Sequence, residues 1–330
     1  MLNLERGKQI LYLTQAEVVG LGLTRREILD CVRDALTEHG NKRYEMPAKI
    51  GVHPYEDVFF HAMPAFLPEL KLVGEKWIAC YPRNPKDFDL PQTTGVLIVN
   101  DQETGVPTAI MDCAWLTAMR TPAVTVLMAE KLAPDAHCFG MFGCGVQGRE
   151  HIEFVNEHLD NIDEIVVYDR YPEVAEQLVQ NLQGTVRAKI RIGASPEAIA
   201  KECDLLSSAT LIVREPLSIV KREWVSAGQT IIPCDLNTFW DPRIPIEADY
   251  YIVDSAAEHD LFVEMGYYPT GHPTIMAESG EVIAGLAPGR TSADQLIVNS
   301  NIGMAVCDMA VAGAILRRAL EVEAGTVLDL

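Results

Sequence analysis

The stretch CFGMFGCGVQG at residues 138–148 decides the fold of this chain. Its apolar first half, Cys138–Phe142, predicts a short buried strand. Gly143, Gly145 and Gly148 follow with the spacing G-x-G-x-x-G. The first glycine permits a tight turn, the second lets the backbone approach a pyrophosphate, and the third allows close helix–strand packing. A strand, this turn and then a helical stretch predict a Rossmann unit that binds a dinucleotide.

An acidic residue stands where such a unit needs one. Glu164–Asp169 (EIVVYD) predicts the next strand, and Asp169 follows Gly148 by 21 residues. A carboxylate there accepts hydrogen bonds from a ribose diol and repels a 2′-phosphate, which favours NAD over NADP. Arg170 is able to hold that phosphate, so NADP stays possible. The competing interpretation, a glycine-rich turn that only connects strand and helix, is disfavoured by this context.

Strands alternate with helices after about residue 120. Further strands are predicted at 188–192, 205–210, 230–235 and 250–254, with helical patches between several of them. This alternation is typical of a parallel, doubly wound sheet.

The N-terminal third has a different pattern. Its β segments are interrupted by Pro and Gly, and Thr24-x-x-Glu27 is a capping box that predicts the start of one early helix. A long apolar helix is predicted near the C-terminus, at about Gly303–Ala324. It can cross back to the first domain or line a subunit interface. We therefore predict an α/β protein with a Rossmann domain and a smaller α+β domain.

Composition excludes several classes of partner. The 330 residues include 27 Lys and Arg against 47 Asp and Glu, a net charge of −20. This balance argues against binding nucleic acid or an anionic membrane. No uncharged run reaches the length of a transmembrane helix, and the start lacks the features of a secretory signal. The eight cysteines form no C-x-x-C pair, so we expect no metal site and reduced thiols in a cytoplasmic protein.

Four charged residues stand in apolar surroundings: Lys49, Lys76, Arg120 and Asp235. A lone cation beside a strand is usually solvated, so each cation alone indicates little. Asp235 ends a predicted strand, and ligands of open α/β sheets bind beyond the carboxyl ends of the strands. An aspartate there could anchor an amine or move a proton, and it could equally cap the following loop.

Short motifs spread over nearly the whole chain carry a family resemblance. They are MPAK at 46–49, MPA at 63–65, G-x-K-W at 74–77, ETG at 103–105, MD at 111–112, RT at 120–121, GCG-x-Q at 143–147, G-x-x-x-G-R at 285–290, and a glycine and an aspartate at 303 and 308. In this order and spacing the chain resembles the ornithine cyclodeaminase/mu-crystallin family, which also contains archaeal-type alanine dehydrogenases and ketimine reductases.

The resemblance implies a domain organisation. Residues 1–119 with 305–330 would form a substrate-binding and dimerisation domain, and residues 120–304 the Rossmann NAD-binding domain. Homodimers are usual in the family, so a homodimer is expected here.

The resemblance also implies roles for individual residues. Lys49 and Arg120 would grip a substrate carboxylate, Lys76 would be the active-site lysine, and Asp235 would stand beside the substrate's α-nitrogen. The chemistry of a small amino or imino acid agrees, because its carboxylate needs cations and its nitrogen a proton-transfer group. The implied cofactor-binding residues are Thr121, Gly143, Gly145, Val146, Gln147, Asp169 and Arg170.

Three departures from the family pattern bear on the substrate and the cofactor. His61 occupies a substrate-binding position where ornithine cyclodeaminases have a glutamate that helps to hold a second amine, which disfavours ornithine. Pro91-Gln92-Thr93 replaces the common Pro-Thr, so one cofactor contact should be altered. Residues 236–240 read LNTFW in place of a Gly- and Pro-containing loop, so we expect a different pocket rim.

Three functions remain in competition. The first is an NAD(P)-dependent oxidoreductase that transfers hydride at Cα of a small α-amino or α-imino acid. The second is a cyclodeaminase, a lyase that uses NAD catalytically and releases ammonia. The third, a cofactor-binding storage protein, is disfavoured because it has no need of Lys76, Arg120 and Asp235 together.

Overall fold

The structure is a computed structural model that describes residues 2–236 and 238–330. The chain folds as two compact units, residues 1–120 with 304–330 and residues 121–303. Helices and strands alternate along most of the chain, so the fold is α/β, as predicted. The functional domains predicted from the resemblance stay a prediction, because compactness alone assigns no role to a unit.

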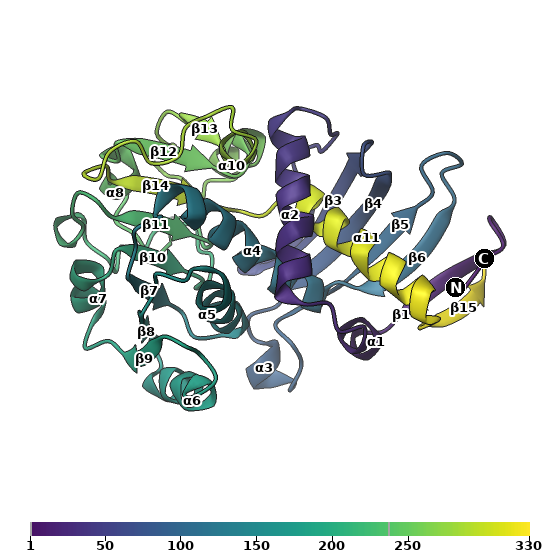
Figure 1. Cartoon of the computed structure of the whole chain (residues 1–330), viewed down its shortest axis with the longest axis horizontal. Helices are drawn as coiled ribbons and strands as arrows, with labels where there is room; N and C mark the ends of the chain where they lie inside the picture. Colours follow the sequence, from purple (N-terminus) through teal and green to yellow (C-terminus); the bar gives the residue numbers. More distant parts are fainter. Residues whose placement is uncertain (1, 237) are drawn as a thin grey trace. The chain divides into compact units, whose positions relative to one another are not determined.

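The first unit is a seven-stranded, mostly antiparallel sheet with helices on one face (Figure 1). The strand order is β15-β1-β6-β5-β4-β3-β2, and only β1 and β6 pair in parallel among its described strands. Helix α11 packs on β3, β4 and β5 and against α2. The elements are β1 (Gln9–Leu13), α1 (Gln15–Gly20), α2 (Arg25–Gly40), β2 (Ile50–Tyr55), β3 (Val58–Leu67), β4 (Leu72–Cys80), α3 (Asn84–Asp87), β5 (Thr93–Asn100), β6 (Pro107–Asp112), α11 (Ala305–Val322) and β15 (Thr326–Asp329).

The predicted capping box starts helix α2. The backbone N–H of Glu27 donates to Thr24 Oγ1 at 3.2 Å, and the backbone N–H of Thr24 donates to Glu27 Oε2 at 2.8 Å. These two bonds satisfy donors that the first turn of a helix otherwise leaves unpaired. The apolar face of α2 then packs against α11, which joins the C-terminal segment to the N-terminal third.

One long helix, α4 (Ala114–Leu132), was not predicted. It begins in the first unit and continues into the second, and it carries Arg120 and Thr121. Most of its residues are buried, so no amphipathic stripe marks it in the sequence. Pro122 lies inside it, and a proline there is usually a sign that a helix ends.

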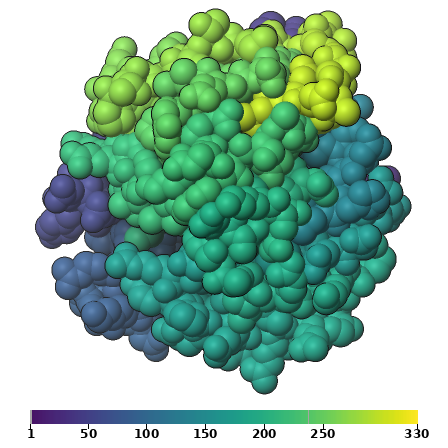
Figure 2. All heavy atoms as spheres, turned by 90° about the vertical axis from the view of Figure 1, so that its left-hand side faces the viewer, coloured from purple at the N-terminus to yellow at the C-terminus, as the bar shows by residue number. Residues whose placement is uncertain are grey.

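The second unit is an eight-stranded sheet in which every paired strand is parallel, as predicted. The strand order is β13-β12-β14-β11-β10-β7-β8-β9. Figure 2 looks onto this unit, whose atoms are coloured from teal to yellow-green. Its elements are β7 (Cys138–Phe142), α5 (Val146–His158), β8 (Glu164–Tyr168), α6 (Pro172–Leu182), β9 (Lys189–Ile192), α7 (Pro196–Glu202), β10 (Leu205–Ser208), β11 (Thr230–Pro233), α8 (Arg243–Ile246), β12 (Tyr250–Val253), α9 (Ala256–Glu264), β13 (Ala277–Glu278), α10 (Ser279–Ile283) and β14 (Ile297–Ser300), with a short 3₁₀ helix at Arg222–Trp224.

The order of the strands reverses beside β7. From β7 the chain adds β8 and β9 on one side, and then returns to place β10 and β11 on the other. In open parallel sheets this reversal leaves a crevice at the carboxyl ends of the strands, where ligands bind. The glycine turn follows β7 directly, so it lies at that switch point.

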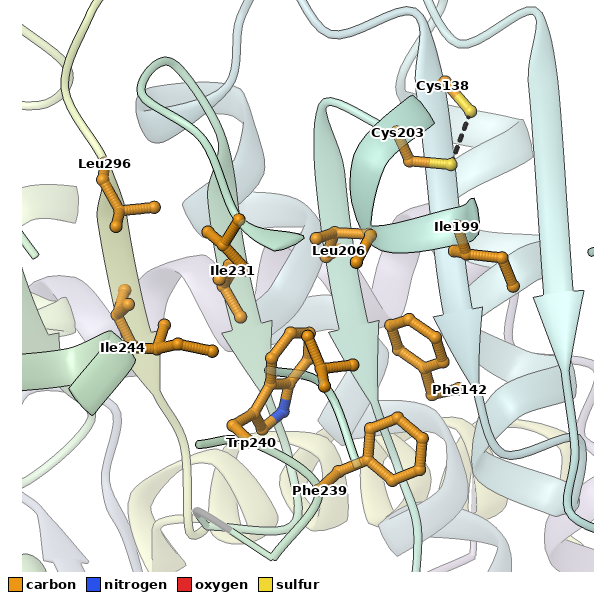
Figure 3. Close-up of a cluster of buried hydrophobic side chains, with 14 of the residues drawn as sticks. Cys138, Phe142, Ile199, Cys203, Leu206, Ile231, Phe239, Trp240, Ile244 and Leu296 are labelled. Carbon is orange, nitrogen blue, oxygen red and sulfur yellow. Dashed lines mark hydrogen bonds between the residues drawn. The ribbon is translucent and has the colours of Figure 1, made fainter. Parts of the chain in front are cut away.

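Aliphatic side chains and a few aromatic rings fill the core near these strands (Figure 3). The rings of Phe142 and Phe239 lie 4.8 Å apart, and Trp240 meets Phe142 edge to face at 5.6 Å. The segment at 236–240 was predicted to shape a pocket rim, but Phe239 and Trp240 are buried in this core. Asn237 lies outside the described residues.

Two further observations concern the described part of the chain. Its helices include none that is both long enough and apolar enough to cross a membrane. Its His, Cys, Asp and Glu side chains include no group of three or more arranged to hold a metal ion.

Candidate active site

The glycine turn has the geometry of a phosphate cradle. Gly143 has φ +96°, and a Cβ there would lie 2.6 Å from the carbonyl oxygen of Ala209. A Cβ at Gly148 would collide with the carbonyl oxygen of Gly143. Gly145 is the N-cap of α5, and no atom lies within 4 Å of where its Cβ would stand. There is therefore open space beside Gly145, and Val146, the first residue of α5, is also exposed. Room of this kind at a helix N-terminus is what an approaching phosphate needs.

Asp169 is tied to this turn. Its Oδ2 accepts a hydrogen bond from the backbone N–H of Cys144 at 2.8 Å, and its Oδ1 accepts one from the backbone N–H of Tyr171 at 2.9 Å. These bonds fix the carboxylate just beyond the end of β8. Arg170 is exposed, and its guanidinium carbon lies 5.9 Å from the centroid of the Tyr171 ring.

The remaining predicted cofactor residues differ in exposure. Val146 is exposed at the start of α5, and Gln147 follows it half-buried. Thr121 is half-buried on α4. The segment Pro91-Gln92-Thr93, which departs from the family pattern, lies in the first unit. There the carbonyl of Gln92 accepts a hydrogen bond from the backbone N–H of Tyr81 at 2.7 Å.

Asp235 is fully buried just beyond β11. Its Oδ1 accepts from Ser208 Oγ at 2.6 Å, and its Oδ2 accepts from the backbone N–H and the hydroxyl of Thr210 at 3.1 and 2.5 Å. Trp240 Nε1 donates to the same Ser208 oxygen at 2.7 Å. Burial raises the pKa of Asp235, and these hydrogen bonds offset only part of that rise. The carboxyl group is thus held rigidly with a pKa shifted toward neutral pH.

A second cluster, in the first unit, joins three charged side chains. Lys76 Nζ lies 2.7 Å from Asp308 Oδ2, and Arg120 Nε donates to Asp308 Oδ1 at 2.9 Å. All three are buried, with Lys76 only 1% exposed. The three residues come from β4, α4 and α11. We call them the Lys–Asp–Arg centre.

Burial and charge act in opposite directions in this centre. Burial lowers the pKa of Lys76 to about 8, with a further lowering from Arg120, although Asp308 opposes the shift. Burial alone would raise the pKa of Asp308, but Arg120 and Lys76 outweigh it and lower that pKa. Asp308 is therefore a carboxylate at neutral pH. Lys76, with its lowered pKa, can gain or lose a proton at a pH near neutral.

Two more predicted residues are buried in the same unit. Lys49 directly precedes β2, and His61 lies on β3. Met63 is opposite Lys76 in the β3–β4 register, so His61 and Lys76 are diagonal neighbours on one face of the sheet. Burial lowers the pKa of His61 to about 3, with contributions from Lys49, His53 and Lys76. His61 is thus neutral at physiological pH, and its ring stacks on Phe59 at 4.1 Å.

Four of the residues predicted for the substrate site lie in the first unit and are linked in pairs: Lys49 and Lys76 both act on His61, and Lys76 and Arg120 share Asp308. Sequence reasoning missed the role of Asp308, which it used only as part of a family motif. A signal was present, because Asp308 is the one charged residue in the apolar run 302–316. An acid in a helix that is otherwise apolar on all sides needs a buried cation as its partner.

These features define a class of protein. The doubly wound parallel sheet with a glycine turn at its switch point is a Rossmann domain, and the first unit carries the buried Lys–Asp–Arg centre. The chain belongs to the ornithine cyclodeaminase/mu-crystallin family, whose family model matches residues 9–323. The resemblance predicted from the short motifs is thereby confirmed.

Individual relatives cover nearly the whole chain. The alanine dehydrogenase of Archaeoglobus fulgidus is 31% identical over an alignment of 326 positions, which covers 96% of this chain and 98% of that protein. A solved archaeal alanine dehydrogenase dimer with bound NAD has a TM-score of 0.86 and 30% identity, covering 97% of this chain and 99% of that one. The Thermococcus litoralis Delta(1)-pyrroline-2-carboxylate reductase, solved with NADH and L-proline, has a TM-score of 0.85 and 26% identity, covering 96% and 99%.

Proposed function

We propose that this chain is an NAD(H)-dependent oxidoreductase that acts at Cα of a small α-amino or α-imino acid. The observation that carries the proposal is the Lys–Asp–Arg centre, in a chain that also has the glycine turn and Asp169. In this centre two cationic side chains, Lys76 and Arg120, share the single carboxylate of Asp308. A substrate carboxylate would give these buried cations a further charge-assisted hydrogen-bond acceptor.

Each side chain has a separate task. Arg120 and Lys49 bind the substrate carboxylate through charge-assisted hydrogen bonds. Lys76, with a pKa of about 8, exchanges a proton with the substrate near neutral pH. Asp235 holds or releases the proton of the substrate nitrogen, and Asp308 positions Lys76 and Arg120. The nicotinamide ring, when bound through the glycine turn and Asp169, supplies or accepts the hydride.

The alternative is a cyclodeaminase, which must also hold the second amine of its substrate. His61 stands at that position, and it is buried and neutral with two lysines among the charges that act on it. A neutral imidazole carries no negative charge to balance a further ammonium group, and the neighbouring lysines repel it. This observation favours the oxidoreductase and a substrate without a distal amine.

A substrate screen with the purified protein tests the proposal. NADH absorbance would be followed with a panel of α-amino acids, and with keto acid and amine pairs in the reverse direction. We expect a net change in NADH concentration with at least one small amino or imino acid. Ammonia release from ornithine or lysine without a net change would establish the cyclodeaminase. Cofactor binding without turnover of any compound would favour a storage protein.

We predict that NADH binds more tightly than NADPH, by about tenfold or more, because like charges placed together cost several kcal/mol. The carboxylate of Asp169 is fixed at the turn by Cys144 and Tyr171, so it cannot easily move away from a 2′-phosphate. Titration of cofactor fluorescence measures both affinities.

Two variants sharpen this measurement. Asp169→Ala should weaken NADH binding and reduce the ratio of NADH to NADPH affinity. Arg170→Ala, the neighbouring substitution, should leave NADH binding unchanged. The prediction would be contradicted if the wild type bound NADPH as tightly as NADH or more tightly. If Arg170→Ala then lost that NADPH affinity, the selectivity would belong to the arginine.

We infer that the protein works as a cytoplasmic homodimer, with no nucleic-acid or membrane partner. The sheet face away from α11 supports the dimer, because it carries a contiguous set of apolar side chains. Trp77 is opposite Ala62 and Val96 in the register, and Phe60 stacks on Trp77 with ring centroids 5.6 Å apart. Val52, opposite Phe60, is 56% exposed, and Trp77 is 39% exposed. Exposed apolar patches of this kind mark protein interfaces.

The charged substitution Val96→Glu should convert the dimer to a monomer at micromolar concentration. A carboxylate at the centre of an apolar interface would be desolvated without a partner. Sedimentation equilibrium measures the mass. Val19→Glu is the matched control, since Val19 is exposed on α1, and it should leave the dimer intact. A monomeric wild type, or a dimer that survives Val96→Glu, would contradict this assignment.

A further inference from the structure

Two thiols meet in the second unit. Cys138 is the first residue of β7, and Cys203 directly follows α7. Their Sγ atoms lie 2.7 Å apart (Figure 3). Both are buried in the apolar core, where Cys138 is 9% exposed and Cys203 1%. Neither residue has a part in the proposed reaction.

The separation of the two sulfur atoms is shorter than an ordinary contact. Non-bonded carbon atoms are most stable at about 3.5–4.0 Å, and sulfur is larger than carbon. A covalent S–S bond measures about 2.05 Å. The two side chains therefore already point at each other, and a shift of less than 1 Å would suffice to join them.

The backbone holds the two residues in this position from both sides. Asp204 Oδ2 accepts from the backbone N–H of Cys138 at 3.0 Å, and the backbone N–H of Asp204 donates to the carbonyl of Cys138 at 3.1 Å. Gln229 Nε2 donates to the carbonyl of Cys203 at 2.7 Å. These bonds hold both backbones in place independently of the thiols, so the two sulfur atoms stay close to each other.

We propose that Cys138 and Cys203 form a reversible disulfide when the protein meets a two-electron oxidant such as hydrogen peroxide. The more exposed Cys138 thiolate attacks the peroxide, the O–O bond breaks, and a sulfenic acid and water form. The Cys203 sulfur then attacks the sulfenic sulfur, the S–O bond breaks, and the second oxygen leaves as water with the thiol proton. Two thiols and one peroxide thus give one disulfide and two water molecules.

The structure also indicates which step of this oxidation is slow and how the disulfide would affect cofactor binding and stability. The contact with Cys138 and burial raise the pKa of the Cys203 thiol, so the second step is slow at neutral pH. The pair lies at the amino end of β7, whereas the glycine turn follows its carboxyl end, so cofactor binding should be unchanged. The bond would close a loop between residues 65 positions apart and raise the melting temperature by about 5–15 °C.

Peroxide treatment of the full-length protein, followed by alkylation and peptide mapping, tests the proposal. We expect a peptide linked through Cys138 and Cys203, a higher melting temperature, and reversal of both by dithiothreitol. Cys138→Ala and Cys203→Ala should each show neither the linked peptide nor the rise in melting temperature. Cys80→Ala, which removes a half-buried thiol of the other unit, should keep both.

The mapping of the wild type decides the outcome even if an alanine variant fails to fold. Alkylation of both residues as free thiols, under conditions that oxidise other cysteines, would overturn the proposal. So would a sulfinic acid at Cys138 with no linked peptide, because it would show that Cys203 does not resolve the first oxidation product.

Discussion

Lys76→Ala is expected to lower kcat/KM by about 10²–10⁴-fold, the range for loss of a general acid–base group. The protein should still fold, because Arg120 and Asp308 remain as a balanced buried pair at 2.9 Å. NADH affinity should stay close to that of the wild type, since the residues proposed to bind the cofactor lie in the other unit. Steady-state kinetics and a cofactor titration measure the two effects separately.

The pH profile distinguishes a proton carrier from a structural residue. In the direction of amino-acid oxidation, Lys76 must be neutral to accept a proton. The rate should therefore rise with pH up to about 8, the pKa to which burial lowers this lysine. Lys76→Ala should lose that rise. A variant with wild-type kinetics and an unchanged profile would show that the lysine only fills space.

Two further variants control this experiment. Lys8→Ala removes an exposed lysine of the same unit that pairs only weakly with Glu5, and it should have no effect. Asp308→Asn instead leaves Lys76 and Arg120 buried without their carboxylate. Removing one partner from a buried ionic group costs about 3–5 kcal/mol, so this variant should lose stability as well as activity. The contrast between the lysine and aspartate variants separates chemistry from folding.

The second large effect is expected for Asp235→Asn, which should lower kcat by about 10²–10⁴-fold while the fold and the cofactor affinity persist. The amide is nearly the same shape as the carboxyl group. Its oxygen can accept both bonds from Thr210, and its N–H can donate to Ser208 Oγ, whose own proton is free to rotate. It cannot take up a proton or balance the charge of an iminium species.

The competing interpretation makes Asp235 a structural residue that ties the ends of β10 and β11 together. Under that interpretation Asp235→Asn should be nearly as active as the wild type, with at most a small loss of stability. Ser208→Ala is the control that keeps the carboxylate, although it removes both the bond to Asp235 at 2.6 Å and the acceptor of Trp240 Nε1. An active Asp235→Asn enzyme would leave Lys76 or His61 as the proton carrier.

Much of the Rossmann unit was predictable from the sequence because its signals are local. The turn at 143–148 requires glycine at two positions, one for a positive φ and one for close packing, and both requirements act over a few residues. Asp169 directly follows β8, the strand after the turn, so its place beside the turn follows from the regular geometry of parallel strands. The capping box at Thr24 and the apolar C-terminal helix are local in the same sense.

The buried charges of the first unit needed the tertiary structure. The motifs marked Lys76 and Arg120, but nothing along the chain joins Arg120 to Asp308, which is 188 residues away. Helix α4 was missed for a related reason, since burial on all sides removes the periodic pattern that marks a helix. The neutral state of His61 depends on its burial and on neighbouring cations, which no local pattern records.

The sequence by itself therefore determined the class of fold, the site of the dinucleotide turn and which residue types could do the chemistry. Only the tertiary structure decided which charges become partners, which groups lose water and which thiols meet. The physical reason is range. Turn geometry and strand periodicity act between near neighbours in the chain, whereas Coulomb interactions and desolvation depend on distance and burial in space.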